Sequence, residues 1–303
     1  MEILKTRDIG FCFGVRRAIK KAEQAIANLP ANDIYMLGEI IHNPQVIKNF
    51  KKKGINLVQE ITEVPPHKYL ISRAHGIAKS ESKYAKSHDI RLIDTTCPYV
   101  KRLQKLAILL KREKYQIIVF GDIKHPEIRS LLSYIDNKAL VVSSLGHLKN
   151  NKEGQISKKV GLLSQTTKDI GQFNKIGKEI LVHAEELRIY NTICKATTLR
   201  QQATQELAKK VDLMVVIGGL NSANTCRLAF LSAKTGIDTY HIQEEKELAN
   251  KWFKNKKKIG ITSGTSTPDE VTDKVILEIK RIAENIEDSS DNKLKKAGVK
   301  FIK

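Results

Sequence analysis

Short apolar runs alternate with amphipathic stretches along most of the chain. The stretches YQIIVF (115–120) and DLMVVI (212–217) are almost continuously apolar and are predicted to be buried strands, and KIGITS (258–263) is predicted to be a further strand. Between Val15 and Ile26, apolar residues recur at the helical spacing i, i+3, i+4, i+7 and i+11, which predicts a helix with one apolar face. Apolar strands that alternate with such helices indicate parallel sheets covered on both faces. The pattern therefore predicts an α/β fold with mainly parallel sheets.

Polar, chemistry-bearing residues gather just after these predicted strands. His42, His75 and His125 each follow a different strand, and Thr166 follows the strand VGLLS (160–164). Open α/β sheets bind their ligands at the carboxyl ends of their strands. We therefore expect the loops of several small sheets to converge on one site, although a single histidine after a strand is more often an ordinary surface or core residue.

Three cysteines share one local setting. Cys12 (GFCFGVRRAI), Cys97 (DTTCPYV) and Cys194 (TICKATTLRQ) each lie in a tight polar or glycine-bearing loop ahead of a helical pattern. A helix N-terminus is expected to lower the pKa of a thiol and so to favour the thiolate that a metal needs. Any one of them alone would be read as a buried cysteine. Cys226, in ANTCRLAF, is predicted to be a cysteine of a helical core and is left out of the set.

With one such cysteine roughly every ninety residues, the pattern predicts three α/β domains around a common centre. Their expected bounds are 14–95, 96–192, and 1–13 together with 193–284, with a polar tail over 285–303 to which no fold is assigned. Locally, the pattern predicts a helix over 169–186, an exposed connection over 146–159, and a helix start at Thr267-Pro268-Asp269-Glu270 in which Thr267 is the N-cap.

Three thiolates suit either zinc, with a histidine as fourth ligand, or an iron–sulfur cluster. Structural zinc sites usually use close C-x2-C pairs, and the chain has none. A [4Fe–4S] cluster on three cysteines keeps one iron without a protein ligand, and that iron can act as a Lewis acid on a substrate oxygen. The spacing favours the cluster over zinc.

The remaining polar loops offer donors for an anionic substrate. His42, His75, Ser222, Asn224 and Ser266 are uncharged or switchable donors, and several of them lie at predicted helix starts, where phosphate groups bind well.

Glu127 lies beside His125 and is expected to face the loop that carries Thr166. Near an electron-rich cluster its pKa is expected to be raised, which would make it a proton donor. The alternative, an ordinary helix-start glutamate, explains the residue equally well by itself.

Composition narrows the classes of protein further. The 303 residues include 53 lysines and arginines against 33 acidic residues, a formal charge of +20, yet the lysines are scattered and no aromatic residues are interleaved with them. This pattern disfavours a nucleic-acid-binding protein and suits an anionic substrate and an acidic protein partner. No signal pattern or membrane-spanning apolar run is present, and four cysteines without a CxxC pair predict a cytoplasmic protein.

Taken together, nine motifs resemble one family in order across 12–268. These are GFCFGVRRAI, IHNP, RAHG, DTTCPYV, HPE, QTT, TICKATTLRQ, NSAN and GTSTP, and the family is that of the 4-hydroxy-3-methylbut-2-enyl diphosphate reductases, also called LytB or IspH. The resemblance implies a trefoil of three α/β domains around an oxygen-sensitive [4Fe–4S] cluster on Cys12, Cys97 and Cys194. It also implies the last step of the non-mevalonate pathway, a two-electron reductive dehydration that yields isopentenyl and dimethylallyl diphosphates.

The resemblance further implies roles for the loop residues. The substrate hydroxyl would bind the open iron, and Glu127 would relay protons through Thr166, with His125 alongside. The diphosphate would be held by His42, His75, Ser222, Asn224 and Ser266. Electrons would come one at a time from a reduced ferredoxin or flavodoxin.

The chain departs from the family pattern at three places. Lys124 replaces the usual glycine before His-Pro-Glu, Ala223 stands where many members have a second serine, and the tail after the last helix is short. None of these departures involves a predicted cluster ligand. Two other hypotheses remain open: a cluster-dependent hydro-lyase, which needs no reductant, and a zinc-bearing basic protein that binds nucleic acid in a salt-dependent way.

Overall fold

The computed structural model describes residues 1–150 and 156–296, and these contain three parallel four-stranded sheets. The chain folds into two compact units. The central unit is Cys12–Thr198, and the terminal unit joins Met1–Phe11 to Leu199–Lys303. The predicted α/β class with parallel sheets is confirmed.

The first sheet of the central unit has the order β3-β2-β4-β5, from β2 (Ile34–Leu37), β3 (Asn56–Val58), β4 (Tyr69–Ile71) and β5 (Arg91–Ile93). Its helices are α1 (Phe13–Asn28), α2 (Pro44–Lys52) and α3 (Lys79–Ser87), with short 3-10 turns at Ala31–Asp33 and Ile61–Glu63. Leu37 and Leu70 are fully buried and belong to the same apolar cluster as Ala85 of α3. All pairings are parallel, so the loops after β2, β4 and β5 leave the sheet at the same edge.

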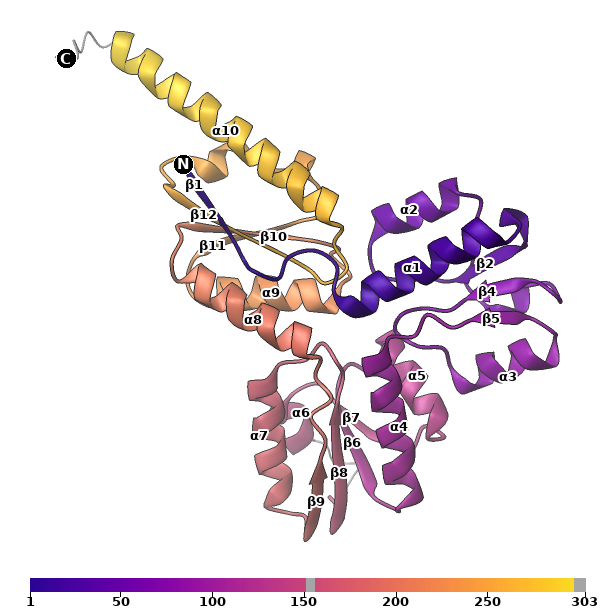
Figure 1. The fold of residues 1–303 in the computed structure, drawn as a ribbon. Helices are drawn as coiled ribbons and strands as arrows, with labels where there is room; N and C mark the ends of the chain where they lie inside the picture. The colour runs from indigo at the N-terminus through magenta and orange to yellow at the C-terminus, as the bar shows by residue number, and fades with distance from the viewer. Residues whose placement is uncertain (151–155, 297–303) are drawn as a thin grey trace. The chain divides into compact units, whose positions relative to one another are not determined.

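The second sheet of the central unit has the order β7-β6-β8-β9, from β6 (Gln116–Phe120), β7 (Leu140–Val142), β8 (Lys159–Ser164) and β9 (Glu186–Ile189). Figure 1 shows α4 (Pro98–Arg112) and α5 (Pro126–Tyr134) on one face and α7 (Ile170–Leu181) on the other, with α6 (Leu145–Lys149) after β7. Ile117 and Val119 pack toward α4 and α5, whereas Ile118 and Phe120 pack toward α7. After Gln116 the strand β6 is apolar, because both of its faces are covered.

The terminal unit contains the third sheet, in the order β1-β12-β10-β11. Its strands are β1 (Glu2–Lys5), β10 (Leu213–Ile217), β11 (Asp238–Ile242) and β12 (Lys258–Ser263). In Figure 1, α10 (Asp269–Lys296) covers one face, and α8 (Lys195–Ala208) and α9 (Ala223–Ala233) lie on the other. Short 3-10 turns occur at Glu245–Glu247 and Asn250–Phe253. Parallel pairing of β10 with β12 places the loops that follow them at one edge.

The three sheets fall inside the three sequence ranges predicted for the domains, and the domain bounds themselves stay a prediction. Several local predictions were wrong. The helix expected over 169–186 ends at Leu181, because Glu185 and Glu186 donate their N–H groups to the Lys158 carbonyl and so begin to pair with β8.

Three further local predictions differ from the structure. The stretch expected to be an exposed connection begins within α6, and residues 151–155 lie outside the described residues. The tail without an assigned fold is helical through Lys296, and 297–303 lie outside the described residues. The Thr267 hydroxyl does not cap α10, because it donates to the Ile217 carbonyl at 3.0 Å. No described helix has both the length and the apolar character needed to cross a bilayer.

Candidate active site

Three thiols gather at helix starts in the central unit. Cys12 and Cys97 are the N-cap residues of α1 and α4, and Cys194 directly precedes α8. All three are half-buried and free of disulfide bonds. A Cβ atom on Gly14 would lie 2.5 Å from Cys97 Sγ and 4.0 Å from Cys12 Sγ, so both sulfurs face the same glycine. Cys194 is close enough to Cys12 for their charges to interact. The structure thus brings together the thiols that the sequence pattern had grouped.

For Cys97 and Cys194, the expectation that a helix start lowers the pKa of the thiol was wrong. Burial raises the pKa of Cys97 to about 11, and it also raises the pKa of Cys194. The backbone N–H groups of Tyr99 and Val100 act on Cys97 in the expected direction, but they are outweighed. Without a bound cation, Cys97 is therefore protonated at neutral pH, and a metal centre would have to displace its proton.

The donor set fits an iron–sulfur group. Three sulfur donors from three separate loops, without a close cysteine pair, match a cluster held by three thiolates better than a structural zinc site. Cys226, which is not in the proposed set, is not the core residue that was predicted. It is exposed on α9 and donates its S–H to the Leu220 carbonyl, because the buried face of that helix is formed by its neighbours at 224, 225, 228, 231 and 232.

Three imidazoles form a second cluster in the central unit. His42, His75 and His125 come from the loops after β2, β4 and β6, and each offers a ring nitrogen within 4.8 Å of the others. The rings of His42 and His75 stack with centroids 4.4 Å apart. Burial, reinforced by His42, lowers the pKa of His125 to about 4 and the pKa of His75 well below its ordinary value. His75 and His125 are therefore neutral at pH 7, and His75 Nδ1 is a buried atom without a hydrogen-bond partner.

Glu127 lies in the first turn of α5 and is 1% exposed. Its two carboxylate oxygens accept hydrogen bonds from Thr166, one from the backbone N–H at 2.7 Å and one from the hydroxyl at 2.7 Å. Burial nevertheless raises the pKa of Glu127 to about 7, against the opposing effect of these two hydrogen bonds. The pKa of Glu127 is thus raised, as predicted, and the cause is burial. A carboxyl group with this pKa can take up or release a proton near neutral pH.

Backbone hydrogen bonds connect two of the thiol-bearing residues to these loops. The N–H of Cys97 donates to the carbonyl of Ala74 at 2.9 Å, next to His75. The N–H of Cys194 donates to the carbonyl of Thr166 at 2.9 Å. Sulfur donors, an imidazole and the buried carboxyl group thus meet at the carboxyl ends of the central unit's parallel strands.

The terminal unit has its own cluster of polar groups, after β10 and β12. Ser222 caps α9 by accepting the N–H of Thr225, and Ser266 is nearly buried in the loop after β12. Asn224 is 2% exposed, and both polar atoms of its amide are buried without a hydrogen-bond partner. Such orphaned groups in a folded protein indicate a missing ligand or solvent molecule. Gly264 permits the loop after β12 to approach α9 closely, because any side chain at this position would collide with Thr225.

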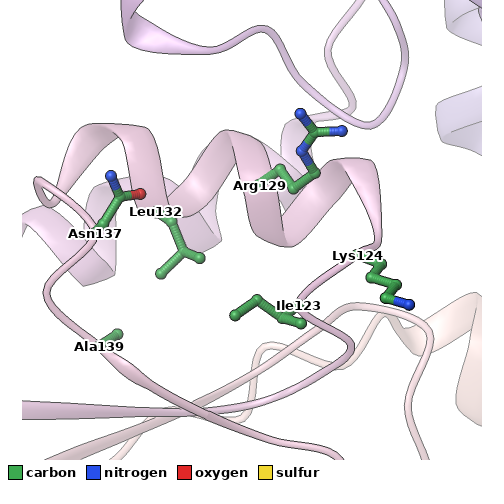
Figure 2. Close-up of a pocket in the computed structure, with 6 residues that line it drawn as sticks. All are labelled: Ile123, Lys124, Arg129, Leu132, Asn137 and Ala139. Carbon is green, nitrogen blue, oxygen red and sulfur yellow. The ribbon is translucent and has the colours of Figure 1, made fainter.

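Two pockets open on the α5 side of the central unit. The larger has a volume of about 820 Å³ and is lined by residues that include Lys124 and Arg129, as Figure 2 shows. The smaller, of about 130 Å³, is lined by residues that include Arg73, Pro126 and Arg129. Lys124, one of the departures from the family pattern, therefore adds its positive charge to the larger pocket, which none of the predicted site residues lines.

Sequence reasoning missed the role of Gly14 and the two backbone hydrogen bonds of the cysteines. The signal for Gly14 was its place two residues after Cys12 in the same motif, where a side chain would fill the space beside the sulfurs. The backbone bonds leave no signal in residue type, since any residue except proline supplies an N–H group.

Comparison with known proteins supports the family resemblance seen in the sequence motifs. The profile of the LytB protein family matches residues 3–280. The 4-hydroxy-3-methylbut-2-enyl diphosphate reductase of Helicobacter pylori (strain Shi470) is 41% identical over 283 residues, which cover 93% of this chain and 100% of that protein. The protein of the same name from Campylobacter hominis is 44% identical over 280 residues, covering 92% of this chain and 98% of the relative.

Solved structures agree with this result. One, described as the structure of (E)-4-hydroxy-3-methyl-but-2-enyl diphosphate reductase, the terminal enzyme of the non-mevalonate pathway, is 36% identical with a TM-score of 0.67 and covers 93% of this chain and 100% of that chain. The E-1-hydroxy-2-methyl-but-2-enyl-4-diphosphate reductase from Plasmodium falciparum is 28% identical with a TM-score of 0.86, covering 91% and 86%. Because the family profile and relatives above 40% identity both span nearly all of the sequence, the chain belongs to the LytB protein family.

Proposed function

We propose that the chain reduces 4-hydroxy-3-methylbut-2-enyl diphosphate to isopentenyl and dimethylallyl diphosphates, the last step of the non-mevalonate pathway. Membership of the LytB family and the names of its relatives support this activity, and they make the chain an oxidoreductase. In the balanced reaction the substrate takes up two electrons and two protons, its C–O bond breaks, a C–H bond forms, and water leaves.

The cofactor that we assign to Cys12, Cys97 and Cys194 is one [4Fe–4S] cluster with one iron that lacks a protein ligand. When bound, it supplies a Lewis acid for the substrate hydroxyl and a path for the electrons. Gly14 leaves the space beside two of the sulfurs free, which supports this assignment.

Glu127 and Thr166 would handle the protons, and their pairing is the observation that carries the proposal. The Glu127 carboxyl group holds a proton that it can give up near neutral pH, and the Thr166 hydroxyl is its hydrogen-bond partner. The backbone of Thr166 accepts the N–H of Cys194, which ties the proton donor to the thiol site. His125, whose Nδ1 accepts the N–H of Glu127 at 3.2 Å, would orient this turn beside the substrate.

We assign polar residues of each unit, taken by itself, to the diphosphate. In the central unit these are His42 and His75, and in the terminal unit they are Ser222, Asn224 and Ser266. The partnerless Nδ1 of His75 and the partnerless amide of Asn224 support a polar ligand at each place. With Ala223 at the start of α9 in place of a serine, binding at that turn would rest on Ser222 and Asn224.

Electrons would come from a reduced ferredoxin or flavodoxin, one at a time. Free thiols that bind a cluster persist in a reducing compartment, which favours the cytoplasm as the place of reaction.

The experiment that tests this function is anaerobic purification followed by iron, sulfide and zinc quantitation and a turnover assay. We expect a brown protein that forms both products only when a chemical reductant such as reduced methyl viologen is supplied. A colourless zinc-loaded protein that stays so after cluster reconstitution would overturn the proposal. Loss of water from the substrate without any reductant would instead identify a hydro-lyase.

A variant at Glu127 tests the proton pathway separately. We expect Glu127→Gln to keep its iron and to lose turnover by roughly a hundredfold or more, the usual range for removal of a general acid. The matched control is Glu23→Gln, at an exposed position of α1 in the same unit, which should be as active as the unaltered protein. Full activity in Glu127→Gln would remove this residue from the mechanism.

A further inference from the structure

Two exposed aromatic rings lie directly beside the thiol site in the central unit. Phe13 is the first residue of α1 and is 65% exposed, and Tyr99 is the second residue of α4 and is 36% exposed. The N-cap residues of these helices are Cys12 and Cys97, and Gly14 brings the two helix starts together. A single exposed apolar side chain needs no explanation, but two rings adjacent to two metal-binding thiols form a distinctive surface.

The charges on the same helix turns are all positive. Arg16 is exposed on α1, and Arg102 and Lys105 are exposed on α4. Neither helix has an acidic residue in its first turn, and α4 has none along its whole length. Arg16 lies in the first turn of α1, where a positive charge works against the helix dipole, whereas Arg102 and Lys105 lie beyond the first turn of α4.

Three further cations of these helices have internal partners that the structure shows. Arg17 donates to the Thr96 carbonyl, Lys21 donates to the Asp94 carbonyl, and Lys101 pairs with the Asp94 carboxylate. These contacts bind α1 to the end of β5 and explain Arg17, Lys21 and Lys101 structurally. They do not explain the exposed cations Arg102 and Lys105.

We infer that the face formed by Phe13, Arg16, Tyr99, Arg102 and Lys105, here called the aromatic face, docks a small acidic one-electron carrier protein. This inference rests on the proposed function, because that reaction needs two electrons that the chain itself does not supply. The carrier is an iron–sulfur or flavin protein that binds in its reduced form, gives one electron to the centre on the thiols, and leaves oxidised. Two such encounters supply one turnover.

The features of this face match what such an encounter requires. Complexes for electron transfer are small and short-lived, so a few apolar contacts surrounded by charges are sufficient. Complementary charge speeds the encounter, and the formal charge of +20 on the chain attracts an acidic protein while repelling a second copy of itself. Because Phe13 follows Cys12 and Tyr99 lies two residues after Cys97, a carrier seated on the rings lies close to the thiols.

The test compares two reductants on the holoenzyme. One is a reduced acidic ferredoxin or flavodoxin at varied concentration, and the other is reduced methyl viologen, a small molecule that needs no docking surface. The variant is Arg102→Glu with Lys105→Glu, which reverses two charges three residues apart on α4. The matched control is Lys83→Glu with Lys86→Glu, which reverses two exposed charges at the same spacing on α3 of the same unit.

We expect the Arg102/Lys105 variant to raise the KM for the carrier by about tenfold at low salt, while its turnover with viologen stays as in the unaltered protein. The Lys83/Lys86 control should match the unaltered protein with both reductants. A second variant, Phe13→Ala, should raise the KM for the carrier several-fold and leave the iron content unchanged. Added salt should raise the carrier KM of the unaltered protein and have little effect on that of the Arg102/Lys105 variant.

The other outcomes distinguish the two proposals. An unchanged carrier KM in both variants would overturn the docking inference and direct attention to the cationic pocket of Lys124 and Arg129 (Figure 2). Equal losses with carrier and viologen in both variants would also overturn it, because they would mean damage to the centre. Absence of turnover in the unaltered holoenzyme with either reductant would defeat the proposed function itself.

Discussion

At the scale of single residues, burial disfavours the charged form of several titratable side chains in the candidate site. The carboxyl group of Glu127 is almost fully enclosed, yet Thr166 supplies two hydrogen bonds that its ionised form prefers. Burial prevails and raises its pKa to about 7. Had the hydrogen bonds prevailed, the residue would be a permanent carboxylate and a poor acid.

This balance predicts a pH dependence of stability. Because the folded pKa of Glu127 is about 7 and its ordinary value is 4.5, the native state binds more protons than the unfolded state between these two values. The resulting stabilisation is complete below the ordinary value and is lost as the pH rises through 7, a change of roughly 3 kcal/mol in the free energy of unfolding. The neutral variant Glu127→Gln lacks this loss.

The measurement is the melting temperature of Glu127→Gln minus that of the unaltered holoenzyme, followed anaerobically from pH 5 to pH 8. We expect this difference to become more positive as the pH rises. The lowered pKa values of His75 and His125 affect both proteins alike and cancel in the subtraction. A difference that does not change with pH would mean that the carboxyl group titrates near its ordinary value.

Gly14 gives a second prediction at this scale. A methyl group at this position would lie 2.5 Å from Cys97 Sγ, so Gly14→Ala must displace a sulfur or the start of α1. We expect it to bind clearly less iron than the unaltered protein. The control is Gly146→Ala in α6, where the new methyl group meets nothing closer than 3.8 Å. Full iron content in Gly14→Ala, measured after anaerobic reconstitution, would contradict the assigned cluster position.

At the scale of elements, α9 carries the proposed substrate-binding residue Asn224 and the exposed Cys226 within a single helical turn. Asn224 is buried with an unsatisfied amide, whereas Cys226 is exposed. An unsatisfied buried polar group costs about 1–3 kcal/mol, which a protein tolerates where a ligand needs the group. The beginning of this helix is therefore less stable than its sequence permits.

We predict that Asn224→Ala raises the melting temperature of the ligand-free protein by a small amount and raises the KM for the diphosphate substrate by about tenfold or more. Cys226→Ser is the control on the same helix and should change neither the iron content nor the KM. A lower melting temperature with an unchanged KM would show that the Asn224 amide has a structural partner instead.

The elements themselves were largely predictable, because buried parallel strands leave a strong apolar signal and polar loops follow them. Parallel pairing of β2 with β4 delivers the loops of His42 and His75 to one edge of the first sheet, whereas His125 comes from the second sheet of the central unit. Where prediction failed, competing interactions decided the outcome. The last residue of the helix expected over 169–186 begins the strand β9 instead. At Cys97, burial raises the thiol pKa more than the helix N-terminus lowers it. Both depend on distant parts of the chain and leave no local pattern.

At the scale of the whole molecule, the excess of positive charge is the dominant property. The formal charge of +20 arises from 53 basic and 33 acidic residues, and repulsion among so many cations weakens the folded state. Raising the ionic strength from about 0.01 M to about 0.1 M shortens the Debye length from about 30 Å to about 10 Å and screens that repulsion.

We therefore predict that the melting temperature of the holoenzyme rises by a few degrees over this range of sodium chloride. Potassium chloride at the same ionic strength should give the same increase if screening is the cause. An equal concentration of a neutral solute such as glycine, which adds no ionic strength, is the control. A constant or falling melting temperature in both salts would show that the charges are already balanced locally.

The backbone hydrogen bonds from Cys97 to Ala74 and from Cys194 to Thr166 have a bearing on how the enzyme ages in air. If these cysteines hold the cluster as proposed, oxidation of a thiol that shifts its backbone would also displace its N–H group. The loops that carry His75 and Thr166 then lose an anchor. Oxygen damage would thus appear as weaker retention of substrate as well as slower electron flow. Rebuilding the cluster would then also restore the loops that bind the substrate.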